Sequence, residues 1–238
     1  MNNDTITQPV RVTPEVFVYN TSTPPTIAKK PQELLHLYNE KNPMLLQRQP
    51  AFDMEHPPVN VIEFANQMLY TMNHYGGVGL AAPQCGMPFR MFVMTGGIVC
   101  INPEIDGTST NTVHLKEGCL SFPGLYMGVT RPESIHIKYT NEFGTRVEAN
   151  WNGVTARIAL HEYDHLEGRV FTSKVGSLTL QMAKKKRDKL LKKIALAVDL
   201  KTQHLKATGK DKTYGRIDTA RVSQHQIPTA AIRSNRES

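Results

Sequence analysis

Hydrophobic residues recur at helical spacing in three parts of the chain. Between residues 59 and 70, apolar side chains lie three and four positions apart, which predicts an amphipathic helix that ends at the Gly76-Gly77 pair. A second helix is predicted at about residues 154–167, closed by Gly168. A third is predicted at roughly residues 177–198.

Four segments between the first two helices carry strand patterns. They are rich in β-branched or other apolar residues and cover residues 90–94, 98–103, 134–140 and 146–151. The third of them alternates, and Asn141-Glu142-Phe143-Gly144 predicts a hairpin turn into the fourth. Strands clustered ahead of the helix at 154–167 predict an α+β fold.

Two changes in composition bound the folded part of the chain. Residues 1–30 carry many Thr, Pro and Asn residues and few large apolar groups, which predicts a flexible N-terminal segment. After Asp199, hydrophobic residues stand singly among polar ones, so residues 201–238 are predicted to form a flexible basic tail. One domain is therefore expected over residues 31–200.

Composition favours a soluble protein of a reducing compartment. No apolar run approaches the length of a membrane span, and the N-terminus lacks the basic-then-apolar order of a secretory signal. Three cysteines, Cys85, Cys100 and Cys119, are too few for a disulfide framework. We expect a cytoplasmic protein without membrane contact.

The run His161-Glu162-Tyr163-Asp164-His165 has the H-E-x-x-H pattern. Residues four apart lie on the same face of a helix, so His161 and His165 can hold one metal ion with Glu162 beside it. Metal-dependent hydrolases use this arrangement. Because the pattern can also arise by chance, a third ligand is needed.

The third ligands of the two common metalloprotease patterns are missing. Phe171 stands where one group has a third His, and no Glu follows Glu167 until Glu237. Asp188 is a candidate but lies in a lysine-rich run, whereas the Cys119 thiolate suits zinc and ferrous iron and would leave a position open to water. A lone cysteine can also be a small buried hydrophobic residue, so both interpretations of Cys119 stay open at this point.

Residues 77–84 superficially match the dinucleotide-binding pattern G-x-G-x-x-A. We reject that interpretation because the preceding segment is predicted to be helical and Pro83 falls where the phosphate-binding helix would begin. A loop is predicted instead, whose glycines let an extended ligand approach the backbone and in which Gln84 offers an amide. Gln84 alone could equally be an ordinary surface residue.

Three separated stretches together resemble the peptide deformylase family: residues 77–84 (GVGLAAPQ), 117–121 (EGCLS) and 161–165 (HEYDH). The resemblance covers about residues 31–175 and implies that residues 31–200 are a catalytic domain. That domain would remove the formyl group from the N-terminal formyl-methionine of nascent polypeptides and release formate. The expected α+β fold has antiparallel β-sheets packed around a central helix that carries the H-E-x-x-H motif, with a C-terminal helix.

The resemblance also implies roles for individual residues. Cys119, His161 and His165 would hold the metal, which is typically ferrous iron (Fe2+), with zinc, nickel or cobalt able to replace it. Glu162 would act as general base and general acid. The developing oxyanion would be bound by Gln84 and the backbone N–H of Leu120. The nascent peptide would add as a strand near the methionine pocket, in contact with Val78, Gly79, Glu117, Gly118 and Ile158.

The chain departs from the family pattern at two positions. Leu160 stands where the family usually has Gln before the first ligand His, which could alter packing behind the metal without removing a ligand. Tyr126 stands where other members have Arg, so substrate anchoring could differ there. Arg131 matches a family arginine and could pair with Glu117.

Two other functions remain to be weighed against a deformylase. A zinc metallopeptidase is the alternative enzyme, although it lacks the third ligand described above. The net charge of +7 and the lysine-rich run at residues 184–193 suit an acidic partner, so a ribosome contact through the basic C-terminal helix is a further hypothesis. The same run could be a solvated helix face, because no nucleic-acid motif or interleaved aromatic residues accompany it.

Overall fold

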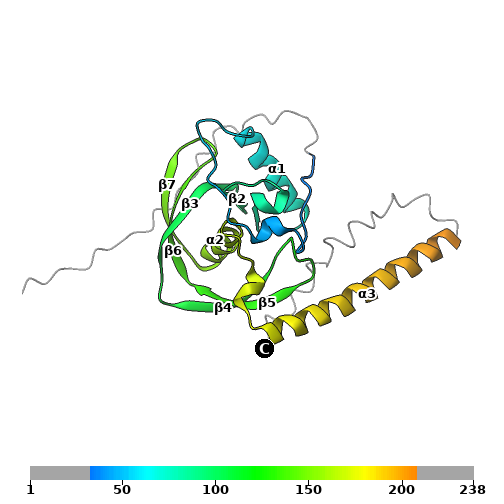
Figure 1. Ribbon diagram of the computed structural model, residues 1–238. Coiled ribbons are helices and arrows are strands. Elements are labelled where there is room, and N and C mark those ends of the chain that lie inside the picture. The colour runs from blue at the N-terminus through cyan, green and yellow to red at the C-terminus, as the bar shows by residue number, and fades with distance from the viewer. Residues whose placement is uncertain (1–32, 208–238) are drawn as a thin grey trace, which may run out of the picture. The chain divides into compact units, whose positions relative to one another are not determined.

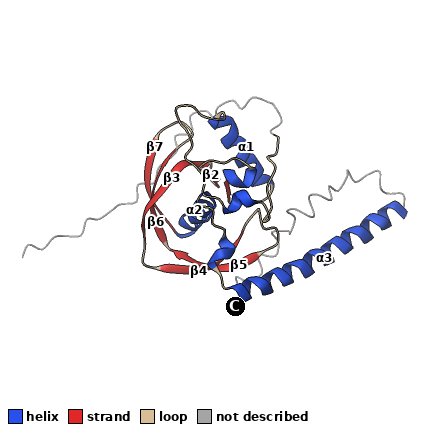
Figure 2. Ribbon diagram, in the orientation of Figure 1, coloured by secondary structure: helices blue, strands red, loops and turns tan. Residues whose placement is uncertain are grey.

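Two antiparallel sheets and three α-helices make up the part of the chain that the computed structural model describes, residues 33–207 (Figure 1). The larger sheet has the strand order β1-β2-β3-β6-β7, and β4 pairs with β5 in the smaller sheet (Figure 2). The α+β class with antiparallel sheets is therefore confirmed. The strands are β1 (Gly79–Ala81), β2 (Met91–Met94), β3 (Ile98–Thr108), β4 (Thr112–Gly118), β5 (Tyr126–Pro132), β6 (Ser134–Thr140) and β7 (Arg146–Asn152). The α-helices are α1 (Val61–His74), α2 (Gly153–Leu166) and α3 (Ser177–Ala207), and the short 3-10 helices are η1 (Pro43–Leu46), η2 (Ala82–Cys85) and η3 (Phe171–Lys174).

Helix α1 begins and ends at signals that are visible in the sequence. The Asn60 side chain accepts a hydrogen bond from the N–H of Glu63 at 3.0 Å and so caps the first turn. After Tyr75, Gly76 takes a φ of 69°, a left-handed conformation that glycine adopts without steric cost. The predicted end of this helix at the glycine pair is confirmed.

Residues 77–84, where a loop was predicted, contain the short strand β1. Gly79–Ala81 pairs antiparallel with β2, and β1 forms one edge of the larger sheet. All three residues of β1 are buried. A strand of three residues is too short to show a period of two, which is why the pattern did not indicate it.

Strands β4 and β5 were also absent from the predicted elements. In β5 the buried positions alternate regularly and the last of them is Arg131. In β4 the apolar Leu115 is exposed and the buried residue is Glu117. The side chains of Glu117 and Arg131 form an ion pair with each other. The buried pair therefore breaks the hydrophobic alternation that identifies a strand.

The core lies around α2, which contacts strands of both sheets. Its Ala156, Ala159 and Leu166 pack in one cluster with Phe92 and Ile137 of the larger sheet. A second cluster lies between α1 and the opposite face of β2 and β3, and a third includes residues of β5 and η3. Because α2 is enclosed in this way, polar side chains on it are held at defined positions.

Helix α3 extends through Ala207, nine residues beyond the predicted end near Val198. No glycine or proline interrupts the sequence between residues 177 and 208, so nothing local stops the helix there. The predicted boundaries at residues 30 and 200 remain predictions. Residues 1–30 and the chain beyond residue 207 lie outside the described residues. None of the described helices has the length and apolar character needed to cross a membrane.

Candidate metal centre and active site

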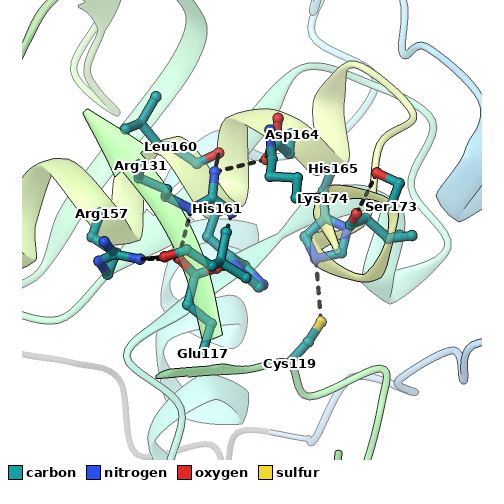
Figure 3. Close-up of polar contacts among 12 residues, drawn as sticks. Glu117, Cys119, Arg131, Arg157, Leu160, His161, Asp164, His165, Ser173 and Lys174 are labelled. Carbon is teal, nitrogen blue, oxygen red and sulfur yellow. Dashed lines mark hydrogen bonds and ion pairs between the residues drawn. The ribbon is translucent and has the colours of Figure 1, made fainter. Parts of the chain in front are cut away.

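Three potential metal ligands from two distant parts of the chain converge. Cys119 follows the end of β4, and His161 and His165 lie one turn apart on α2. Their ligand atoms all lie within 4.8 Å of one another, and the Cys119 Sγ is 3.3 Å from the His165 Nε2 (Figure 3). Ligands of a tetrahedral thiolate and imidazole site lie about 3.3–3.6 Å apart. The pair formed by Cys119 and His165 has this spacing, and the donor set of one thiolate and two imidazoles suits a single divalent cation.

The surroundings shift the pKa values of the two imidazoles in opposite directions. Burial lowers the pKa of His161, but hydrogen bonds to Cys119 and Glu117 outweigh it and raise that pKa to about 10. The pKa of His165 lies well below 6.5 because the ring is buried and faces the positive charges of His161 and Arg131. Metal ligation requires both rings to be neutral, so a bound cation has to displace the proton of His161, whereas His165 already lacks one.

Glu117 orients the first histidine. Its Oε2 lies 3.0 Å from the Nδ1 of His161, which directs the other ring nitrogen towards the ligand cluster. Two buried arginines hold the carboxylate: Arg131 donates to both of its oxygens, at 2.6 and 2.9 Å, and Arg157 donates at 2.6 Å (Figure 3). The pairing of Arg131 with Glu117 that the sequence suggested is confirmed.

Arg131 also connects the smaller sheet to the ligand-bearing helix. Its Nη1 donates to the carboxylate of Asp164 at 2.8 Å and to the carbonyl of Leu160 at 3.2 Å. Asp164 in turn pairs with Lys174 of η3 at 3.1 Å. Leu160 therefore contributes its backbone here, while its side chain packs against the hydrophobic cluster around α2.

Glu162 is enclosed next to the ligand cluster. It is 4% exposed, and its Oε2 has no hydrogen-bond partner. Burial raises the pKa of this carboxyl to about 7, close to the value that suits a group that both accepts and donates a proton. A Cβ atom on Gly79 would lie only 2.3 Å from the Oε1 of Glu162. The carboxylate therefore occupies the space that the side chain of any residue other than glycine would need at position 79.

Gln84 lies in η2 with its amide directed at the same cluster. Its Oε1 accepts from the N–H of Ala81 at 2.8 Å, and its Nε2 lies 3.2 Å from the Oγ of Ser121 and 3.4 Å from the Sγ of Cys119. The residue is 2% exposed, so it is not an ordinary surface glutamine. The fixed oxygen leaves the amide nitrogen as the group that faces the site.

The predicted substrate contacts lie on or beside β1, the end of β4 and α2. Val78 is 56% exposed at the start of the edge strand β1, and Gly118 is exposed at the end of β4. A Cβ on Gly118 would lie 2.6 Å from the Tyr126 ring, so the ring covers that glycine. Ile158 is buried on α2, four residues before Glu162, and Leu120 packs partly buried against the cluster around α1.

Arg157 and Ser121 contact residues of the site, and the sequence analysis predicted no role for either of them. Arg157 also donates to the carbonyls of Val129 and Val113, which ties α2 to both strands of the smaller sheet. It precedes His161 by four residues, so the spacing that relates His161 to His165 could have placed it on the same helix face. Ser121 lies in the motif at residues 117–121, but no role was predicted for its side chain.

Comparisons with known proteins identify the family of this chain. The family model described as "Polypeptide deformylase" matches residues 35–181. The peptide deformylase of Thermotoga maritima is 40% identical over 130 residues, which cover 53% of this chain and 79% of that protein.

Solved structures show the same likeness. The peptide deformylase of Legionella pneumophila has a TM-score of 0.61 at 32% identity, with 68% of this chain and 98% of that chain covered. A peptide deformylase of Synechococcus elongatus in complex with actinonin gives a TM-score of 0.61 at 33% identity, covering 68% of this chain and 90% of that one. The chain belongs to the peptide deformylase family, hydrolases that remove the N-formyl group from nascent polypeptides.

Proposed function

We propose that the chain hydrolyses the formamide of N-terminal formyl-methionine with a metal held by Cys119, His161 and His165. The observation that carries the proposal is the convergence of these three donors with the buried carboxylate of Glu162. When bound, the metal lowers the pKa of a water molecule and polarises the formyl oxygen. The proposed metal is Fe2+, with zinc, nickel or cobalt able to replace it, because a thiolate and two imidazoles suit all four ions.

The side chains around the metal transfer the proton, bind the oxyanion and orient a metal ligand. Glu162 accepts a proton from the attacking water and returns it to the amine nitrogen as the carbon–nitrogen bond breaks, so that formate and a free amine are released. The Nε2 of Gln84 and the backbone N–H of Leu120 donate to the oxyanion that develops on the formyl group. Glu117, with Arg131 and Arg157 behind it, keeps His161 in the tautomer and orientation of a ligand.

The peptide substrate is proposed to extend the larger sheet. Strand β1 is an edge strand, and Val78 beside it is exposed, so an extended peptide can pair with the backbone at Val78 and Gly79. Gly118 would lie on the other side of that peptide. The methionine side chain would lie near Ile158 and Glu117.

Two substitutions test the assignment of roles. We expect Glu162→Ala and Cys119→Ser to reduce formate release from a formyl-Met peptide by at least about 10²-fold while the fold survives. Matched controls are Glu55→Gln, an exposed carboxylate, and Cys100→Ala, a buried thiol outside the site. Full activity of both test variants would contradict the proposal, and cleavage of casein by the wild type would favour a metallopeptidase instead. Metal analysis of protein purified without air identifies the ion.

A ribosome contact through α3 is the second part of the proposal. The helix carries nine basic and two acidic residues, a net charge of +7 that equals the net charge of the whole chain. Lys185, Lys189 and Lys192 are exposed on it and available to phosphates. We also propose a cytoplasmic location, supported by three cysteines that are all free thiols.

The ribosome contact is tested by sedimentation. We expect Lys185→Gln, Lys189→Gln and Lys192→Gln together to reduce co-sedimentation with ribosomes and to flatten its dependence on salt. Deformylation of a short peptide should stay unchanged. The control removes three charges elsewhere, at Lys41, Lys116 and Arg146. Equal binding of the wild type and both triple variants would count against the contact.

A further inference from the structure

The segment that precedes η1 lies against the turn that carries Gln84. The N–H of Tyr38 donates to the backbone carbonyl of Gln84 at 2.8 Å. On the other side, the Gln84 side chain is hydrogen-bonded to Ala81 and Ser121, as described above. The backbone and the amide of Gln84 are thus held by different parts of the chain.

The Tyr38 ring covers the end of the same turn. Gly86 caps η2 in a left-handed conformation with a φ of 81°. A Cβ atom at Gly86 would lie 2.8 Å from the Cε2 of Tyr38 and 3.0 Å from its Cζ, so the ring packs directly on this glycine. The His36 ring meets the Tyr38 ring edge to face at 5.3 Å.

The segment around Tyr38 is itself anchored at three points. The N–H of Leu35 donates to the Oγ1 of Thr71 in α1 at 3.0 Å, and Leu37 is buried in the cluster around α1. Two residues after Tyr38, Glu40 forms a bidentate ion pair with Arg187 of α3, at 2.6 and 3.2 Å. Tyr38 is therefore a fixed wall for η2 rather than a loose neighbour.

Helix η2 depends on such outside support. It has four residues, and 3-10 helices of this length have poor hydrogen-bond geometry and little stability of their own. A group that stabilises an oxyanion must be held within about 0.5 Å of its productive position. The position of the Gln84 amide is consequently decided by the residues that contact η2.

We propose that Tyr38 is a positioning residue for deformylation, which acts by holding η2 so that the Gln84 amide faces the formyl oxygen. The inference rests on the proposed role of Gln84. It concerns only the position of the amide. Among the described residues, Tyr38 contacts Gln84 and Gly86, and no contact joins it to the three candidate metal ligands.

Kinetics of Tyr38 variants provide the first test. We expect Tyr38→Ala to lower kcat for a formyl-Met peptide about tenfold, with KM and bound metal within about twofold of the wild type. Tyr38→Phe keeps the ring and should retain full kcat. Tyr38→Leu provides the same comparison if Tyr38→Ala does not fold, as judged by its near-UV circular dichroism. A wild-type kcat in both Tyr38→Ala and Tyr38→Leu would overturn the inference.

A double-mutant cycle with Gln84→Met distinguishes positioning from a general structural effect. If Tyr38 acts through the amide, replacing Tyr38 by Ala in the Gln84→Met background should change kcat less than about twofold. The same tenfold loss in both backgrounds would overturn the role of Tyr38 and leave that of Gln84 intact. Full activity of Gln84→Met alone would overturn the proposed role of Gln84, and the role of Tyr38 with it.

Discussion

At the residue scale, the surroundings shift the pKa values of two carboxylates, Glu117 and Glu162, in opposite directions. Burial raises the pKa of Glu117, but hydrogen bonds with His161 and Arg131 outweigh it and lower the value to about 2. Glu162 is buried without a comparable partner, and its pKa rises to about 7. One carboxylate stays ionised and holds a ligand, while the other can exchange a proton near neutral pH.

The depressed pKa of Glu117 predicts a pH dependence of stability. The unfolded chain binds a proton at this group near pH 4.5 and the folded chain only near pH 2, so the contribution of Glu117 is present above pH 4.5 and is lost as the pH falls towards 2. The free energy of unfolding is measured by urea denaturation in the presence of a chelator. We expect it to fall less for Glu117→Gln than for the wild type as the pH is lowered from about 5 to about 3. Glu55→Gln should follow the wild type, and parallel curves for all three proteins would contradict the prediction.

Gly79 is required by the space that Glu162 occupies. Because a Cβ at this position would lie 2.3 Å from the Glu162 Oε1, the Gly79→Ala variant must displace the carboxylate. A displacement of about 1 Å can cost 10²-fold in rate, so we expect a loss of kcat of that order with metal content unchanged. Gly176→Ala is the matched control, because a Cβ there meets only the Thr179 Oγ1, at 4.0 Å. An unaltered kcat in Gly79→Ala would show that the carboxylate moves freely.

At the element scale, α3 is attached to the rest of the described chain near its N-terminal end. Leu180 and Ala183 pack against the cluster that includes β5 and η3, and Arg187 forms its ion pair with Glu40. The Arg187 and Glu40 side chains are 12% and 21% exposed, so this pair is better shielded than an ordinary surface pair. These contacts hold residues 180–187 of α3 against the rest of the described chain.

Removing the ion pair should loosen α3 without unfolding the domain. We expect Glu40→Gln to speed amide hydrogen exchange in residues 177–190 several-fold and to lower the free energy of global unfolding by only about 1 kcal/mol. Exchange in α1 should not change. Lys185→Gln, which removes an exposed charge from the same helix, is the control. Unchanged exchange throughout α3 would mean that the apolar contacts alone hold it.

At the scale of the whole molecule, the proposed metal joins elements that are far apart in the sequence. Cys119 follows the smaller sheet, and His161 and His165 belong to the helix that contacts both sheets. A cation bound by all three would connect these parts only in the folded state. Metal binding should therefore stabilise the whole domain.

Metal removal tests this coupling. With free metal at about 1,000 times its Kd, binding to the folded state alone adds about 4 kcal/mol to stability, so chelation should lower Tm by several degrees. Cys119→Ser should lose most of this difference, whereas Cys100→Ala should keep it. A Tm that is the same with and without chelator in the wild type would argue against a shared metal.

The sequence by itself determined several of the local elements and the reaction class. The end of α1 and the hairpin after β6 were predictable because a period of 3.6, a glycine in the left-handed region and a turn motif are local properties. The spacing of His161, Glu162 and His165 was informative for the same reason. Together with the motifs at residues 77–84 and 117–121, it indicated the family.

Only the tertiary structure decided how these groups meet. That the Cys119 sulfur lies 3.3 Å from His165, and that Arg131 and Arg157 both reach Glu117, depends on the packing of a sheet against a helix. Such contacts join residues more than ten positions apart, and no local periodicity encodes them. The strands β4 and β5 were missed because Glu117 and Arg131 occupy buried positions in them. The ion pair that supports the site therefore also interrupts the hydrophobic pattern by which its strands could have been recognised.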